Sequence, residues 1–328
     1  MQSARKSLDG HYSGVSPQLL ARVRQNWSAL SIDLDAVWRD TMHALPGFAE
    51  LDALPVFPES RPVDLLLLFD QGCCWVDTLR HVCLMLQARG GEGKLTPQQV
   101  QGLIAVTARL RDELAAVRML TVAGLSMPAM QIARSISEDV DLALLLLIRK
   151  KHAASFVDCR SPEEAAEFWR RHIAGGRAFR LVAQALYRFG LDFSNDSDYA
   201  RWRKEVLVFL GSVVHTSVVH PTQAGPGPDA GLQPGRGQGL DAAAQECLYF
   251  ATIRVQELCA YSLVLGAGLR EDLATLAPAP GLETDRLRLA RFGGDIIVDQ
   301  MRWLTDTRDT DPQTDPQTGP QTDPEQLH

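Results

Sequence analysis

The sequence lacks the features of a membrane-spanning or a strongly basic protein. No apolar run approaches the ~18 residues that a bilayer-spanning helix needs, and the longest, Leu142–Ile148, is followed directly by Arg149, Lys150 and Lys151. Basic residues do not outnumber acidic ones, and the formal net charge is −7. The chain as a whole therefore does not attract nucleic acid or anionic membranes, although this charge still allows a local basic face.

Common catalytic and cofactor signatures are also missing. The sequence contains no GxxxxGK[ST], GxGxxG, HExxH or GxSxG motif, no repeated ExxH, and no helix-turn-helix pattern with a basic recognition helix. Its six cysteines form no CxxC pair, so we expect reduced core residues. The N-terminus, Met1–Tyr12, has no apolar centre of a signal peptide. We therefore expect a cytoplasmic protein without a cofactor.

Helix start and stop signals divide the chain into about eight helices. Thr96-Pro97-Gln98-Gln99 and Ser161-Pro162-Glu163-Glu164 each combine an N-cap, a proline at the first helical position and a capping-box residue. The expected segments are Pro17–Leu45 in two pieces, Pro62–Arg89, Pro97–Gly124, Pro128–Asp158, Pro162–Phe189, Asp196–His220, Leu240–Gly268 and Glu283–Leu304. No stretch shows sustained strand-like alternation. The sequence thus predicts an all-α fold, a single multi-helix bundle over residues 1–305 without significant sheet.

Two segments have compositions that do not favour helix. Residues 221–239 are dominated by glycine and proline and are predicted to form a mobile loop inside the bundle domain. Residues 306–328 contain a near-exact repeat of DPQT and no apolar residue before Leu327. Because such a segment cannot contribute to a core, we expect a disordered C-terminal tail.

The first candidate site is a polar stripe on the otherwise apolar segment Met130–Ile148. Arg134, Glu138 and Asp141 share one helical face, and the spacing of Arg134 and Glu138 allows an ion pair. Polar groups on a buried helix need partners. We favour structural ion pairs between helices, and the alternative is a pocket in which Glu138 or Asp141 acts as a base or a metal ligand. Asp139 falls on the apolar side, where it needs a partner or a raised pKa.

A second polar stripe lies on Trp202–His220, which is largely apolar around it. Ser212 and His215 are three residues apart on a helix and can form a hydrogen bond. A catalytic pair also needs an orienting group and an oxyanion site, so the spacing alone does not define one. A single histidine in an apolar helix is more often a core residue. The catalytic alternative combines Ser212 and His215 with Glu138 and Asp141 from the first stripe.

Two further patterns have simple structural explanations beside functional ones. Cys74, Asp77 and His81 have helical spacings that three zinc ligands could share, but structural zinc sites use knuckles and short loops, so we expect no metal. A second pattern is an arginine stripe that can contact phosphates, although a solvated helix face is the commoner explanation. The stripe consists of Arg170, Arg177, Arg180 and Arg188. Gly175-Gly176 within it predicts a kink or a close helix crossing.

Three motifs in this order resemble a known family. They are Ala133–Glu138, Ser161–Trp169 and Leu210–His215 with the following His220-Pro221. The order resembles a bacterial all-helical family of unknown function, found in some defence-associated proteins and loosely similar to HEPN-type domains. The resemblance covers about residues 100–265 and implies a helical bundle with Arg134, Glu138, Ser212 and His215 as its positions of interest. The arginine–histidine spacing of HEPN-type ribonucleases does not occur here, so the resemblance implies architecture rather than ribonuclease activity.

These observations favour a non-catalytic interaction or regulatory module, and the resemblance implies an association with defence or stress. Its partner is a protein, a second copy of the chain or another molecule, and no membrane is expected. One alternative is a hydrolase or nuclease-like enzyme that uses a buried acid–histidine site. The other is nucleic-acid binding through the arginine stripe, which predicts binding that weakens steeply with salt.

Overall fold

The computed structural model describes residues 7–45, 57, 59–90, 92–192, 197–214, 240–278 and 281–309, and these ranges form helices and connections without a strand. The α-helices are α1 (Leu8–His11), α2 (Pro17–Ala29), α3 (Leu34–Ala44), α4 (Arg61–Ala88), α5 (Pro97–Val122), α6 (Ser126–Ile148), α7 (Lys150–Val157), α8 (Pro162–His172), α9 (Arg177–Tyr187), α10 (Asp198–Val214), α11 (Ala242–Leu265), α12 (Ala267–Thr275) and α13 (Leu282–Asp309). The all-α prediction is confirmed. The predicted number of about eight is too low, because twelve of these helices are longer than the single turn of α1.

Two of the expected helices are each divided by a break in the backbone. The segment from Pro128 ends at Arg149, whose extended backbone (φ −131°, ψ 89°) separates α6 from α7. The segment from Pro162 is divided at Gly175 and Gly176, which have φ values of +65° and +70°. Glycine adopts this left-handed conformation without a side-chain clash, so the kink predicted there is confirmed. The short helix α12 after Gly266 was not predicted.

The predicted cap at the start of α5 is present and also joins two helices. Thr96 accepts a hydrogen bond from the Gln99 backbone, and the Gln99 side chain reaches back to Thr96 to complete a capping box. The Gln99 amide then donates to the carbonyl oxygens of Leu146 and Leu147 at 2.9 Å. One residue therefore satisfies backbone groups at the start of α5 and at the end of α6.

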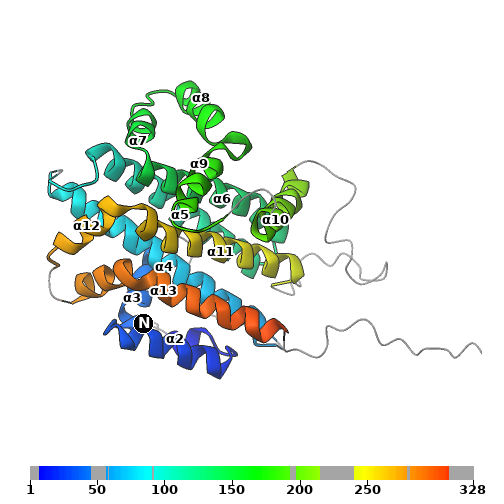
Figure 1. Cartoon of the computed structure of the whole chain (residues 1–328). Helices are drawn as coiled ribbons and strands as arrows, with labels where there is room; N and C mark the ends of the chain where they lie inside the picture. Colours follow the sequence, from blue (N-terminus) through cyan, green and yellow to red (C-terminus); the bar gives the residue numbers. More distant parts are fainter. Residues whose placement is uncertain are drawn as a thin grey trace, which may run out of the picture.

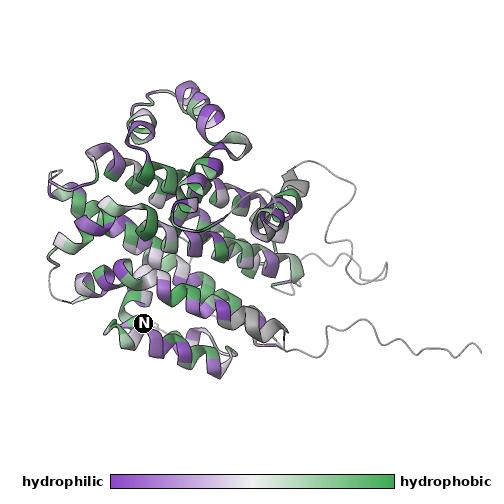
Figure 2. Cartoon of the chain, viewed as in Figure 1, coloured by the Kyte–Doolittle hydropathy of each residue, from purple (hydrophilic) through white to green (hydrophobic). Residues whose placement is uncertain are grey.

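The core lies among α4, α5, α6 and α11, with α13 packed along α4 and α11 (Figure 1). α4 is apolar nearly all round and is buried on most of its length, as expected for a central helix. α2 and α3 cover the α4–α13 side, and α7 packs against α5 and α6. Figure 2 shows this order, since hydrophobic colours are concentrated in the central helices and hydrophilic colours in the outer ones. Among the described helices, none is long and apolar enough to cross a membrane.

Three predicted segments extend beyond the described ranges. The Gly/Pro-rich loop at 221–239 and the tail after Asp309 lie outside them. α13 continues to Asp309, so its last residues fall within the segment from Asp306 that was predicted to be a disordered tail. α10 is described only to Val214, short of the predicted end at His220.

Candidate functional site

Asp141 of the first polar stripe lies in a buried group of four charges. Arg254 on α11 donates from Nη2 to Asp141 Oδ1 at 2.6 Å, and Arg203 on α10 donates to Asp141 Oδ2. Arg254 also pairs with Glu257 and donates from Nη1 to the Tyr199 hydroxyl at 2.9 Å. We call Asp141, Arg203, Arg254 and Glu257 the four-charge cluster; each of these side chains is at most 8% exposed. Two cations and two anions balance within it and connect α6, α10 and α11.

The four-charge cluster has the contacts of a structural network. Both oxygens of Asp141 accept hydrogen bonds from arginine, which leaves this carboxylate poorly placed to receive a substrate proton. The guanidinium of Arg203 also lies 3.7 Å from the centre of the Phe179 ring on α9, a cation–π contact. These contacts favour the ion-pair interpretation of Asp141 over a role as a catalytic base.

Glu138, one turn before Asp141, contacts a different part of the molecule. Its Oε2 accepts a hydrogen bond from Trp169 Nε1 of α8 at 2.9 Å, and its side chain is half-buried. Among the described residues, Glu138 forms no ion pair with Arg134, so the pairing that their spacing allows is not made. Glu138 therefore helps to attach α8 to α6 rather than to complete a site with Asp141.

The other two predicted catalytic residues are on or beyond the end of α10. Ser212 belongs to the last turn of α10, where the structure describes the backbone only, and His215 lies outside the described residues. The Arg203–Asp141 pair places α10 against α6. Within the described part of the chain, Glu138 and Asp141 are thus not assembled with a histidine into a catalytic group.

Asp139, which sequence analysis placed on the apolar side of its helix, is buried between α5 and α6. Arg109 Nε on α5 lies 3.0 Å from Asp139 Oδ2 and donates a hydrogen bond to Glu113 Oε1 at the same distance. One guanidinium is therefore shared between two carboxylates. Burial, followed by the negative charge of Glu113, raises the pKa of Asp139 to about 8, while Arg109 opposes the rise. The prediction that Asp139 needs a partner or a raised pKa is confirmed on both counts.

A surface cleft of about 670 Å³ lies above this pair, between α5 and α6. It is lined by Ala108, Arg109, Asp112, Glu113, Ala116, Gln131, Ile132 and Ser135. Arg109 Nη2 donates to the Ser135 hydroxyl at 2.6 Å, and Ser135 donates to Glu113 at 2.8 Å. A carboxyl group that holds a proton near neutral pH can exchange protons, but Asp139 is not among the residues that line the cleft, whereas Arg109, which contacts it, is.

The three residues with zinc-like spacing are not assembled around a metal position. Asp77 pairs with Arg286 at 2.8 Å, and His81 Nε2 lies 4.0 Å from Glu283. Burial raises the pKa of the Cys74 thiol strongly, which disfavours the thiolate that zinc binds. No group of three metal-binding side chains occurs in the described ranges.

The four arginines of the predicted stripe have different surroundings. Arg170 pairs with Glu167, and Arg177 donates to the carbonyl oxygens of Arg170 and Ala174 at the end of α8. Arg180 and Arg188 are exposed and form no ion pair with any described residue.

Two exposed aromatic residues that flank Arg188 were not identified from the sequence. Tyr187 is 68% exposed and Phe189 is 57% exposed, at the C-terminal end of α9. The tripeptide Tyr187-Arg188-Phe189, in which a basic residue separates two aromatic ones, was the available signal. α9 itself contains no aspartate or glutamate. We call Arg180, Tyr187, Arg188 and Phe189 the α9 surface.

Comparisons with protein-family models, with curated proteins and with solved structures found no match to this chain. The family resemblance of residues 100–265 therefore stays a prediction.

Proposed function

We propose that this protein is a non-catalytic interaction module that binds single-stranded nucleic acid on its α9 surface. The observation that supports this best is the combination of two exposed arginines without ion pairs among the described residues, Arg180 and Arg188, and two exposed aromatic residues that flank Arg188 in sequence. Proteins that bind single strands combine cationic groups for the phosphates with aromatic side chains on which bases stack. The α9 surface supplies both groups along one helix and the two residues that follow it.

The charge of the remaining chain sets the expected strength of this binding. A net charge of −7 repels a polyanion at long range. The α9 surface has two arginines, Arg180 and Arg188. The other two arginines of the stripe already have protein partners, because Arg170 pairs with Glu167 and Arg177 donates to the Arg170 carbonyl oxygen. We therefore expect weak binding that depends on salt and tolerates changes of base sequence.

The non-catalytic part of the proposal is supported by the four-charge cluster. A hydrolase or nuclease-like site built on Asp141 needs an available carboxylate, but both oxygens of Asp141 accept hydrogen bonds from arginine. Glu138 is engaged with Trp169. The loose HEPN-like resemblance and an association with defence or stress stay predictions.

Fluorescence anisotropy with labelled oligo(dT) and oligo(U) tests this proposal. The variants are Arg180→Ala/Arg188→Ala and Tyr187→Ala/Phe189→Ala, which change exposed side chains and leave the core intact. Loss of the stacking rings is expected to weaken binding about tenfold or more. Loss of the two arginines is expected to remove most of the dependence of oligonucleotide affinity on salt concentration.

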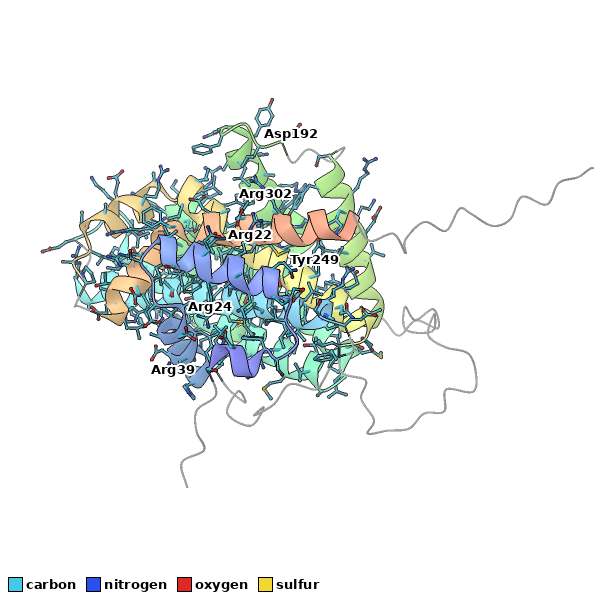
Figure 3. The ribbon with its side chains drawn as sticks, turned by 90° about the horizontal axis from the view of Figure 1, so that it is seen from below. Arg22, Arg24, Arg39, Asp192, Tyr249 and Arg302 are labelled. Atoms are coloured by element: carbon cyan, nitrogen blue, oxygen red, sulfur yellow. The ribbon has the colours of Figure 1, made fainter. Side chains whose placement is uncertain are left out.

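A matched control changes two exposed arginines outside the α9 surface. Arg39→Ala/Arg61→Ala removes the same charge from residues without ion pairs in the described structure. In Figure 3, Arg39 and Asp192, which follows the α9 surface in sequence, lie on opposite sides of the molecule. The control is expected to bind like the wild type. The proposal is wrong if the wild type does not bind at low salt, or if the α9 variants and the control bind equally.

A further inference from the structure

A small cavity adjoins the four-charge cluster between α6, α9, α10 and α11. Its polar lining residues are Asp141, Tyr199, Arg254, Glu257 and Tyr261, and its apolar lining residues include Phe179 and Val182. The volume that the centre of a water molecule can occupy there is about 10 Å³. That volume is close to the least that holds one water, and it excludes larger ligands.

Two polar atoms of residues that line the cavity have no hydrogen-bond partner in the described structure. They are Arg254 Nε, a donor, and Glu257 Oε1, an acceptor. The Arg254 side chain is 1% exposed and the Glu257 side chain is 8% exposed, so bulk water does not satisfy them. Buried polar groups in native proteins are nearly always paired, and an unpaired charged group costs free energy. The two atoms therefore indicate a small bound ligand.

The charges of Arg254 and Glu257 favour water over other small ligands in this cavity. An anion in the cavity would meet the carboxylate of Glu257, and a cation would meet the guanidinium of Arg254. An apolar molecule would leave both polar atoms unpaired. Water accepts one hydrogen bond and donates another within the available volume.

We propose that one buried water molecule binds in this cavity, accepts a hydrogen bond from Arg254 Nε and donates one to Glu257 Oε1. The water completes the hydrogen bonding of Arg254, whose guanidinium already contacts Asp141 on α6 and Tyr199 on α10. It is thus a component of the junction that holds α10 against α6 and α11, independent of nucleic-acid binding on α9.

A high-resolution crystal structure of the full chain tests the position directly. We expect a density peak within hydrogen-bond distance of both Arg254 Nε and Glu257 Oε1. The proposal is overturned if the cavity contains no density, or if the two atoms bond to other protein groups instead.

Water relaxation dispersion in solution provides a second test, because it counts water molecules with long residence times. Val182→Ile adds one methylene group to a residue that lines the cavity, and Val117→Ile makes the same change at a buried position in α5 that is not among the cavity-lining residues. We expect Val182→Ile to have one long-lived water fewer than the wild type and a lower Tm, and Val117→Ile to keep the wild-type water count. An unchanged number of long-lived waters in Val182→Ile would show that the cavity is dry and would contradict the proposal, and a higher Tm would indicate that the added methylene group fills an empty space.

Discussion

Asp139 and Asp141 lie two residues apart on α6 and are about equally buried, but they differ in the charged side chains that contact them. Asp139 is 4% exposed and Asp141 is 5% exposed. Asp141 accepts hydrogen bonds from two arginines, whereas Asp139 shares a single arginine, Arg109, with Glu113. Burial, followed by the negative charge of Glu113, raises the pKa of Asp139 to about 8, and the one arginine opposes this rise only in part. The two carboxylates thus differ in the number of positive charges that contact them rather than in their depth in the protein.

The four-charge cluster and the Asp139–Glu113 pair are also expected to respond differently to pH. The four-charge cluster balances its charges inside the protein and joins three helices. Asp139 and Glu113 are two carboxylates that share one arginine, Arg109, and they lie beside a surface cleft. We therefore expect mutations in the cluster to change stability at all pH values, and mutations of the pair to change how stability depends on pH.

The largest effect is expected for Asp141→Asn. The substitution leaves Arg203 and Arg254 without their shared carboxylate, and removal of one partner from a buried ion pair typically costs about 3–5 kcal/mol. Urea unfolding at pH 7 measures the loss. Asp139→Asn is the matched control on the same helix and is expected to be neutral or stabilising. Equal losses in the two variants would remove the distinction between the two aspartates.

A smaller effect is expected for the pH dependence of wild-type stability through Asp139. The ordinary pKa of 3.8 applies to the unfolded chain and a pKa of about 8 to the folded one, so the folded state binds this proton more tightly. The stabilising contribution is complete below about pH 4, decreases as the pH rises, and is lost above about pH 8. Between pH 6.5 and pH 9 we expect wild type to lose about 2 kcal/mol relative to Asp139→Asn. Urea unfolding at intervals across this range gives the free energy of unfolding of both proteins as a function of pH. Parallel curves for wild type and Asp139→Asn would contradict this assignment.

The smallest effect is expected for Arg109→Gln. The Arg109 side chain is 60% exposed, so its ion pairs are screened by solvent, and their loss should cost no more than ~1 kcal/mol at pH 7. The pKa of Asp139 should rise further, because the one nearby cation that opposes the rise is removed. Carbon-13 NMR titration of the aspartate carboxyl groups measures this pKa directly. A fall in the pKa of Asp139 would show that Arg109 is not its counter-charge.

Local signals in the sequence were sufficient to predict the helical class and several helix starts. The N-caps at Thr96 and Ser161 depend on side chains within three residues of the bond they make, and both are present. The capping box is complete only at Thr96, because the Glu164 side chain accepts a hydrogen bond from the Arg160 backbone instead of the Ser161 backbone. The break at Arg149 was missed because neither glycine nor proline marks it. α12 was missed because its start follows Gly266, which reads as the end of the preceding helix.

The sites were predictable only where the relevant contacts lie within one helix. The 3.6-residue period identified Asp141 as a buried polar residue that needs a partner. Its partners, Arg203 and Arg254, are separated from it by 62 and 113 residues in sequence, and no local pattern selects them from the other arginines. The exposure of Tyr187 and Phe189 likewise depends on which face of α9 packs against α6, which is a property of the tertiary structure.

The most direct test of the proposed function is the salt dependence of oligonucleotide binding to the wild type and to Arg180→Ala/Arg188→Ala. Each phosphate contact on a single strand contributes a slope of about −0.7 in a plot of log K against log salt concentration, so two arginines predict about −1.4. The account predicts this slope for the wild type and a slope near zero for the double variant. A wild-type slope near zero, or an equally steep slope in the double variant, would contradict nucleic-acid binding on the α9 surface.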